Sequence, residues 1–131
     1  MNVLQRMIIN DSTILELLGL TGKTNSEIAK KIIKRSQWSD LASSDKRLCV
    51  YLLPSRPTRN EILFEEIVEV DCHVPAMEDY KARQIVGRVV DVLNNKSING
   101  RYLKAKGQLG ELPTVSGFYC IGVRFGFYSP I

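Results

Sequence analysis

The sequence contains no long run of apolar residues. Its 131 residues are 44% hydrophobic and 24% charged, and no stretch approaches the length that a membrane-spanning helix needs, about 18 apolar residues. The first ten residues, MNVLQRMIIN, hold only short apolar groups and no small-residue cleavage site, so they do not resemble a secretory signal. We therefore expect a protein made in the cytoplasm, without a membrane partner.

Proline and glycine are also scarce. The chain has 5 prolines and 9 glycines, and they do not gather into a linker between two parts. No internal repeat or low-complexity segment is visible. A chain of this length has room for one hydrophobic core but not for two, so we expect residues 1–131 to form a single domain, of the α+β class.

Cysteine and histidine are too few for the usual disulfide or metal frameworks. Cys49, Cys72 and Cys120 are an odd number and have no C-x-x-C spacing. The single histidine, His73, directly follows Cys72, and adjacent residues of a strand point to opposite faces, so the two do not readily share a zinc ion. Nothing nearby matches a nucleophile elbow or a cysteine-protease signature. We expect no metal, no cofactor and no enzymatic activity.

Residues 22–24, Gly-Lys-Thr, match the end of a phosphate-binding P-loop. The motif needs a glycine five residues before Gly22, where this chain has Leu17, and a buried strand before the loop. Thr24 and Glu27 instead fit a capping box, in which the threonine side chain accepts from a backbone N–H three residues on. We expect a helix that begins there and runs to about Arg35, so this stretch joins two helices and binds no nucleotide.

The basic side of that helix leaves an alternative function open. Lys30, Lys31 and Lys34 lie on the side opposite Ile28 and its apolar neighbours. The segment resembles the first helix of a DNA-binding helix-turn-helix, although an isoleucine stands where the motif's turn is needed. One possible function is therefore that of a small DNA-binding or regulatory protein that uses the basic helix 26–35, and we keep it as an alternative.

The first twenty residues carry a helical apolar stripe. It includes Leu4 and Ile8, and Asp11 or Ser12 can cap a second helical segment that Gly19 closes. One kinked helix or two separate helices fit the pattern. From residue 47 the period changes: residues 47–53 predict a buried strand.

Two prolines in residues 54–60 predict a loop after that strand. Residues 61–74 then alternate, with Val68, Val70, Cys72 and Val74 on one face and Ile67, Glu69, Asp71 and His73 on the other. The two strands are expected to form a hairpin with a long basic tip. Residues 76–94 carry the most regular helical stripe, and residues 100–106 and 117–128 predict two further strands. The fold class is therefore α+β: N-terminal helices followed by β-β-α-β-β, with one mainly antiparallel sheet packed on helices.

The charges are unevenly distributed along the chain. Residues 61–79 carry a net charge of −7, whereas residues 23–35 carry +4 and the residues from 96 onward carry +4. An acidic block between two basic ones suits self-association between unlike surfaces.

The order of these parts resembles the tail-terminator or tail-completion (head-to-tail joining) proteins of long-tailed bacteriophages. The resemblance covers roughly residues 11–128 and includes the segments NDSTILELLG, LCVYLLP, EEIVEVDCHVP, AMEDYKARQIVGRVVDVLNN and GFYCIGVRFGFYS. It implies a small α+β subunit of a ring, typically a hexamer, that caps the tail tube and meets the head connector. The implied partners are other copies of the chain and the tail-tube and head-connector proteins, and the implied location is the tail or neck of a virion. Nucleic acid is not an expected partner.

A ring is built from a heterologous interface, in which one surface of a subunit meets a different surface of the next. We expect the acidic strand to meet the basic C-terminal half of a neighbour, with contacts between the acidic residues Glu65, Glu66, Glu69 and Asp71 and the basic residues Lys104, Lys106 and Arg124. An equally supported interpretation has these charges solvated or paired within one sheet.

Two long connections are candidates for contacts along the ring axis, with the tail tube or the head connector. One is the hairpin tip with Arg56 and Arg59, and the other is the loop of residues 107–116 with Gln108 and Glu111. An ordinary loop is the alternative for either.

Overall fold

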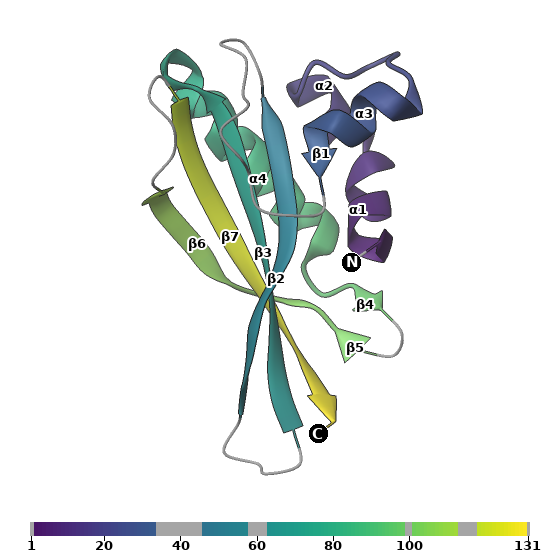
Figure 1. Ribbon diagram of the computed structural model, residues 1–131, viewed down its shortest axis with the longest axis vertical. Helices are drawn as coiled ribbons and strands as arrows, with labels where there is room; N and C mark the ends of the chain where they lie inside the picture. Colours follow the sequence, from purple (N-terminus) through teal and green to yellow (C-terminus); the bar gives the residue numbers. More distant parts are fainter. Residues whose placement is uncertain (1, 34–45, 58–62, 99–100, 113–117, 131) are drawn as a thin grey trace.

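The computed structural model describes residues 2–33, 46–57, 63–98, 101–112 and 118–130. It has the α+β fold, with short N-terminal helices followed by a sheet on which a long helix packs (Figure 1). The helices are α1 (Asn2–Ile9), α2 (Ser12–Leu17), α3 (Asn25–Lys31), the 3-10 helix η1 (Ala76–Glu78) and α4 (Asp79–Leu93). The strands are β1 (Ile32–Ile33), β2 (Arg47–Pro57), β3 (Leu63–Pro75), β4 (Ser97–Ile98), β5 (Arg101–Tyr102), β6 (Lys104–Leu112) and β7 (Phe118–Pro130).

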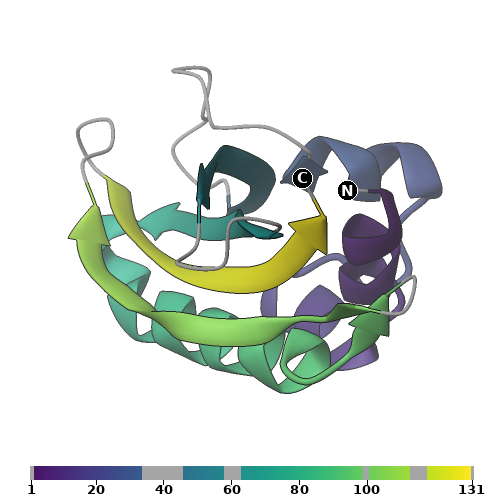
Figure 2. The same cartoon turned by 90° about the horizontal axis from the view of Figure 1, so that it is seen from below.

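The main sheet has the strand order β1-β2-β3-β7-β6. The short β1 runs parallel to β2, and the other neighbours are antiparallel. β2 and β3 form the expected hairpin, and β4 and β5 form a separate two-stranded sheet. The main sheet curves, with α4 along its outer side and the N-terminal helices beside α4 (Figure 2).

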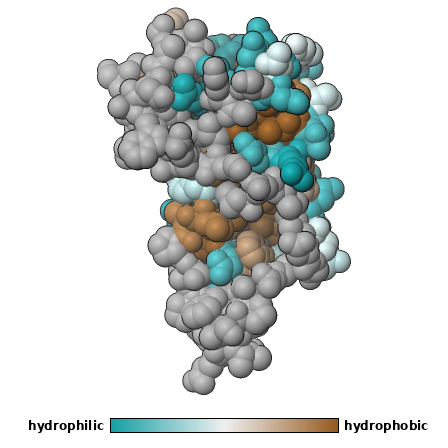
Figure 3. Space-filling view, turned by 45° about the vertical axis from the view of Figure 1, so that its right-hand side comes forward, coloured by the Kyte–Doolittle hydropathy of each residue, from teal (hydrophilic) through white to brown (hydrophobic). Residues whose placement is uncertain are grey.

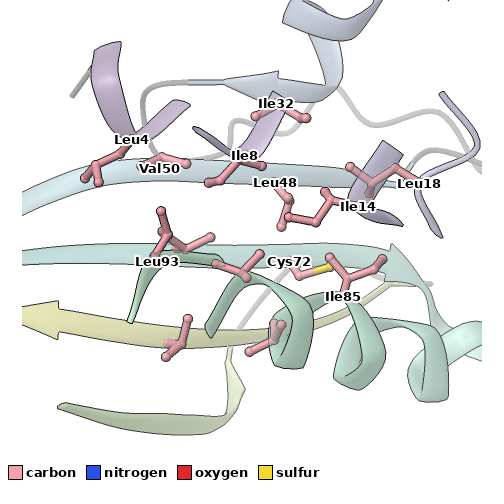
Figure 4. Close-up of a cluster of buried hydrophobic side chains, with 14 of the residues drawn as sticks. Leu4, Ile8, Ile14, Leu18, Ile32, Leu48, Val50, Cys72, Ile85 and Leu93 are labelled. Carbon is pink, nitrogen blue, oxygen red and sulfur yellow. The ribbon is translucent and has the colours of Figure 1, made fainter. Parts of the chain in front are cut away.

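The core forms between the sheet and the helices. Val68, Val70, Cys72 and Val74, which alternate along β3, are fully buried, as the period of 2 predicts. The buried face of α4 consists of Ala82, Ile85, Val86, Val89 and Leu93. Side chains of the N-terminal helices complete the same cluster, and Figure 4 shows several of them facing the strands and α4.

Asp11 joins the N-terminal helices to α4. Its side chain accepts a hydrogen bond from the Ile14 backbone N–H at 3.0 Å, which makes it the N-cap of α2, so α1 and α2 are two separate helices. The Arg88 guanidinium of α4 donates two hydrogen bonds to the same carboxylate, at 2.8 and 3.0 Å. These hydrogen bonds from Arg88 are the main reason that the pKa of Asp11 is below its usual value.

Helix α3 begins as expected but ends early. Thr24 caps it by accepting from the Glu27 N–H at 3.3 Å. The expected continuation to Arg35 is wrong, because Ile32 and Ile33 leave the helix and form β1 beside Leu48 and Cys49 of β2. β-branched side chains favour a strand once an edge is available to pair with. Residues 34 and 35 lie outside the described part.

Two strands are longer than expected. β2 continues through Pro54 to Pro57, so residues 54–57, which were expected in a loop, belong to the strand, and the rest of the expected loop lies outside the described residues. Prolines are tolerated there because β1 pairs only with Leu48 and Cys49, which leaves the rest of β2 as an outer strand in the described sheet, and the register with β3 shifts between Leu53 and Arg56. Likewise, β6 extends over residues 107–112, which were expected in a loop.

Replacing Asp11 by alanine should lower the free energy of unfolding by about 1–3 kcal/mol, because the cap of α2 and both Arg88 hydrogen bonds are lost. Urea denaturation followed by circular dichroism measures this. Asp11→Asn is the matched control: it keeps an oxygen for the cap and should lose less. Equal losses in the two variants would contradict the importance of the cap.

Candidate functional site: the polar face of the sheet

The face of the main sheet that points away from α4 carries a polar cluster. The register places it in three rows of residues paired across β2, β3 and β7, and we call these nine residues the polar cluster. The rows are Tyr51–Glu69–Arg124, Cys49–Asp71–Gly122 and Arg47–His73–Cys120. Because side chains alternate along a strand, each of these residues faces opposite to its core-forming neighbours.

Three titratable residues of the cluster are buried. Glu69 is 4% exposed, Asp71 7% and His73 5%. Of the alternatives left open for the acidic strand, the solvated one therefore does not hold for Glu69 and Asp71. Buried polar groups have to find partners within the chain, since otherwise their desolvation is not compensated.

Glu69 finds two partners across the first row. Arg124 Nε donates to Glu69 Oε1 at 2.9 Å, and Tyr51 Oη lies 2.6 Å from Glu69 Oε2. The same Tyr51 oxygen lies 2.5 Å from Asp71 Oδ2. One phenol therefore links two carboxyl groups of β3, and a guanidinium holds one of them from β7.

The pKa values of Asp71 and Glu69 are shifted in opposite directions. Burial, together with the interaction with Glu69, raises the pKa of Asp71 to about 7. Burial also tends to raise the pKa of Glu69, but the interactions with Asp71, Tyr51 and Arg124 outweigh it and leave that pKa below its usual value. Burial and the two carboxyl groups raise the pKa of the Tyr51 hydroxyl far above its usual value, so it stays protonated.

The second and third rows bring the histidine and two cysteines to one side of the sheet. His73 Nδ1 lies 3.9 Å from Cys49 Sγ. Burial raises the pKa of the Cys49 thiol to about 12, and burial with the nearby Arg47 lowers the pKa of His73. A neutral thiol beside a neutral imidazole is not an activated nucleophile. In the described ranges, no three His, Cys, Asp or Glu side chains converge in a way that would hold a metal ion.

Gly122 makes room for Asp71. A β-carbon at position 122 would overlap Asp71 Oδ1, and it would lie 3.1 Å from Leu112 Cδ1 and 3.3 Å from the Val70 carbonyl oxygen. Asp71 Oδ1 has no hydrogen-bond partner within the described part of the chain. The absent side chain in β7 is thus what allows the carboxyl to sit between the strands.

The charged residues expected at a subunit interface partly pair within the chain. Lys106 Nζ lies 3.0 Å from Glu65 Oε2, and Arg124 pairs with Glu69 as described above. These two ion pairs agree with the alternative interpretation from the sequence, in which the charges pair within one sheet. Glu66 and Lys104 are ion-paired with no described residue; Lys104 instead donates to Asn95 Oδ1 at 2.5 Å and is exposed. Contacts of these residues with a neighbouring subunit stay a prediction.

The residues expected to make axial contacts lie mostly in strands. Arg56 pairs with Glu65 through the backbone of β2 and β3, and Gln108 and Glu111 belong to β6. Their expected location in loops is therefore wrong, because the hairpin and β6 extend further than the prolines and glycines suggest. Arg59 lies outside the described residues. Sequence reasoning also missed Tyr51, although the alternation of β2 and the register with β3 place it opposite Glu69.

Comparison with known proteins finds a similar fold but no similar sequence. The sequence matches no protein-family model and no curated protein. In three dimensions, the chain is similar to a chain of the virion of a native gene transfer agent particle, with a TM-score of 0.64 and 13% sequence identity, over 98% of this chain and 92% of that one. The two chains share a fold. Among the described helices, none is long and apolar enough to cross a membrane.

Replacing Gly122 by alanine should lower the free energy of unfolding by about 1–3 kcal/mol, since the new methyl group meets a carboxyl fixed by Tyr51 and a backbone carbonyl that has little room to move. Gly87→Ala is the matched control, because a β-carbon at that position of α4 meets nothing within 4 Å. It should raise the free energy of unfolding by about 0.4–1 kcal/mol. Urea denaturation of both variants is the measurement, and a neutral Gly122→Ala would contradict the close packing.

Proposed function

We propose that the chain is a structural virion protein of a phage or phage-derived particle, and that it forms a ring that caps the tail tube and joins it to the head connector. The observation that carries the proposal is the fold shared with a chain of a gene transfer agent virion, which extends over nearly the full length of both chains. The order of elements that resembles tail-terminator proteins supports the finer role. The proposed activity is self-association and protein binding, without turnover.

The edges of the main sheet favour association through faces of the subunit. The outer strand β2 contains Pro54 and Pro57, and the outer strand β6 has register shifts between Ala105 and Gly107 and between Leu109 and Glu111. Prolines, bulges and exposed lysines on outer strands are features that oppose pairing of edges between chains. A continuous sheet across subunits is therefore not part of the proposal.

Exposed apolar side chains on several elements are candidates for contact. Met77 is 92% exposed and Tyr80 57% exposed, one turn apart where η1 leads into α4. Leu52 of β2 and Tyr102 of β5 are 50% and 63% exposed. Described apolar side chains also reach the surface in two areas of the face in Figure 3. Two unlike surfaces on one chain are what a heterologous ring contact requires.

The alternative DNA-binding role loses its main support in the structure. It depends on a continuous basic helix over residues 26–35, whereas α3 ends at Lys31 and is followed by β1. No described feature favours that role over the proposed one.

The charged contact between neighbours is tested with Glu66 and Lys104, two expected interface residues of opposite charge that have no ion pair within the described chain. Glu66→Lys and Lys104→Glu should each weaken ring assembly, and the double variant should restore it, because the attraction is re-formed with exchanged signs. Light scattering of the solution mass, with electron microscopy of the particles, measures assembly. Assembly that is unchanged in both single variants would remove this pair from the interface.

The apolar contact is tested with Met77→Ser combined with Tyr80→Ser. This variant should shift the solution mass toward the monomer while its thermal midpoint stays within about 2 °C of the unchanged chain, because both side chains are exposed in one chain and contribute little to its core. Gln84→Ala, exposed on the same helix, is the control and should change neither quantity. An unchanged chain that remains monomeric at high concentration, and also fails to bind purified tail tubes, would contradict the proposed function.

A further inference from the structure

The contacts at Tyr51 require one more proton than the phenol supplies. Its oxygen lies 2.6 Å from Glu69 Oε2 and 2.5 Å from Asp71 Oδ2, and both are hydrogen-bond distances between oxygens. Each such contact needs one hydrogen between its two oxygens, because two lone pairs facing each other repel. The phenol has a single hydrogen, so the second must be on a carboxyl group.

The arrangement identifies which carboxyl group holds that hydrogen. Glu69 accepts a hydrogen bond from the Arg124 guanidinium at 2.9 Å, and a carboxylate facing a permanent cation is ionised. Asp71 has no ion-pair partner in the described chain, and its other oxygen, Oδ1, packs beside Gly122 without a hydrogen-bond donor. A buried carboxyl group without a cation is less costly neutral than charged.

We propose that Asp71 is a buried proton-binding site: its carboxyl O–H donates to Tyr51 Oη, and the Tyr51 O–H donates to the Glu69 carboxylate held by Arg124. In this order every short contact has one hydrogen, and the four groups together carry one positive and one negative charge. These hydrogen bonds run across β2, β3 and β7, so they connect three neighbouring strands through side chains as well as through the backbone.

Among the described residues, the surroundings of Asp71 offer no other charge that would replace the proton. The groups on this face are Arg47, Cys49 and Tyr51 from β2, Glu69 and His73 from β3 itself, and Cys120 and Arg124 from β7. Burial raises the pKa of both thiols, which therefore stay neutral. Arg124 is bound to Glu69, and Arg47 lies one row away, opposite His73. From β6, the apolar Leu112 approaches next to Gly122.

The proposal makes the sheet sensitive to pH in a defined direction. The pKa of Asp71 is about 7 in the folded chain and is near 3.8 without the fold, so folding takes up a proton between these values. The stability from this group is complete below about pH 4, is lost as pH rises toward 7, and stays lost above it. The lowered pKa of His73 acts in the opposite direction, because stability from that group is lost as pH falls below 6.5.

Asp71→Asn separates the two effects. The asparagine amide can donate to Tyr51 as the protonated carboxyl does, but it does not titrate. Unfolding equilibrium constants from urea denaturation at pH values between 4.5 and 8 are compared for the two chains. We expect the constant of the unchanged chain to rise relative to that of Asp71→Asn by up to about tenfold per pH unit until about pH 7, and then to level off.

The control is Glu66→Gln, which removes a carboxylate from the same strand without touching the cluster and should keep the pH dependence of the unchanged chain. Identical pH dependence in Asp71→Asn and the unchanged chain would overturn the proposal. Carbon NMR of the carboxyl groups gives a second measurement, which serves even if Asp71→Asn does not fold. One carboxyl should titrate near pH 7 and move to lower pH in Glu69→Gln; the absence of any carboxyl that titrates above about pH 6 would equally overturn it.

Discussion

The pairing of β3 with β7 is the interaction on which the other parts of the structure depend. The two strands pair along 13 residues, from Leu63 opposite Pro130 to Pro75 opposite Phe118. β3 also pairs with β2 on its other side, so its backbone is enclosed by strands. One of its faces supplies core residues against α4, and the other supplies Glu69, Asp71 and His73, which are also buried. A central strand of this kind has to satisfy its polar side chains within its own sheet.

That constraint gives the charges of the sheet a role within one chain. A shift of β3 by one residue would turn Glu69 and Asp71 toward the core and the valines toward Tyr51 and Arg124, so the polar face helps to specify the register of three strands. The ion pair of Glu65 with Lys106 extends the same complementarity to β6. The acidic and basic residues that the sequence predicts to attract one another do so in two pairs, Glu65 with Lys106 and Glu69 with Arg124, but both pairs join strands of one chain. In the proposed ring, contacts with other chains therefore use side chains that the sheet does not use.

The parts of the fold that follow local patterns were predicted from the sequence. The stripe of α4 and the alternation of β3 depend on residues close together in the chain, and both are confirmed. The end of α3 was not predicted, because Ile32 and Ile33 become a strand only when the distant β2 provides an edge. The polar cluster was not predicted either. Its members at positions 51, 69, 71 and 124 meet only through the register, and residues 47–53 read as a strand that is apolar on both faces.

The chain shares its fold with the gene transfer agent chain at only 13% sequence identity. A sheet packed on helices requires apolar residues at the right period, and many sequences satisfy that requirement with different side chains. Function depends on particular residues at particular places, and a shared fold does not carry those over. The exposed Met77 illustrates the point. Packing in the described chain does not use a side chain that is 92% exposed, so the fold places no demand on the residue at this position. Residues of this kind, which the fold neither needs nor buries, can differ between two chains that share a fold, and any difference in what the chains bind has to lie in them.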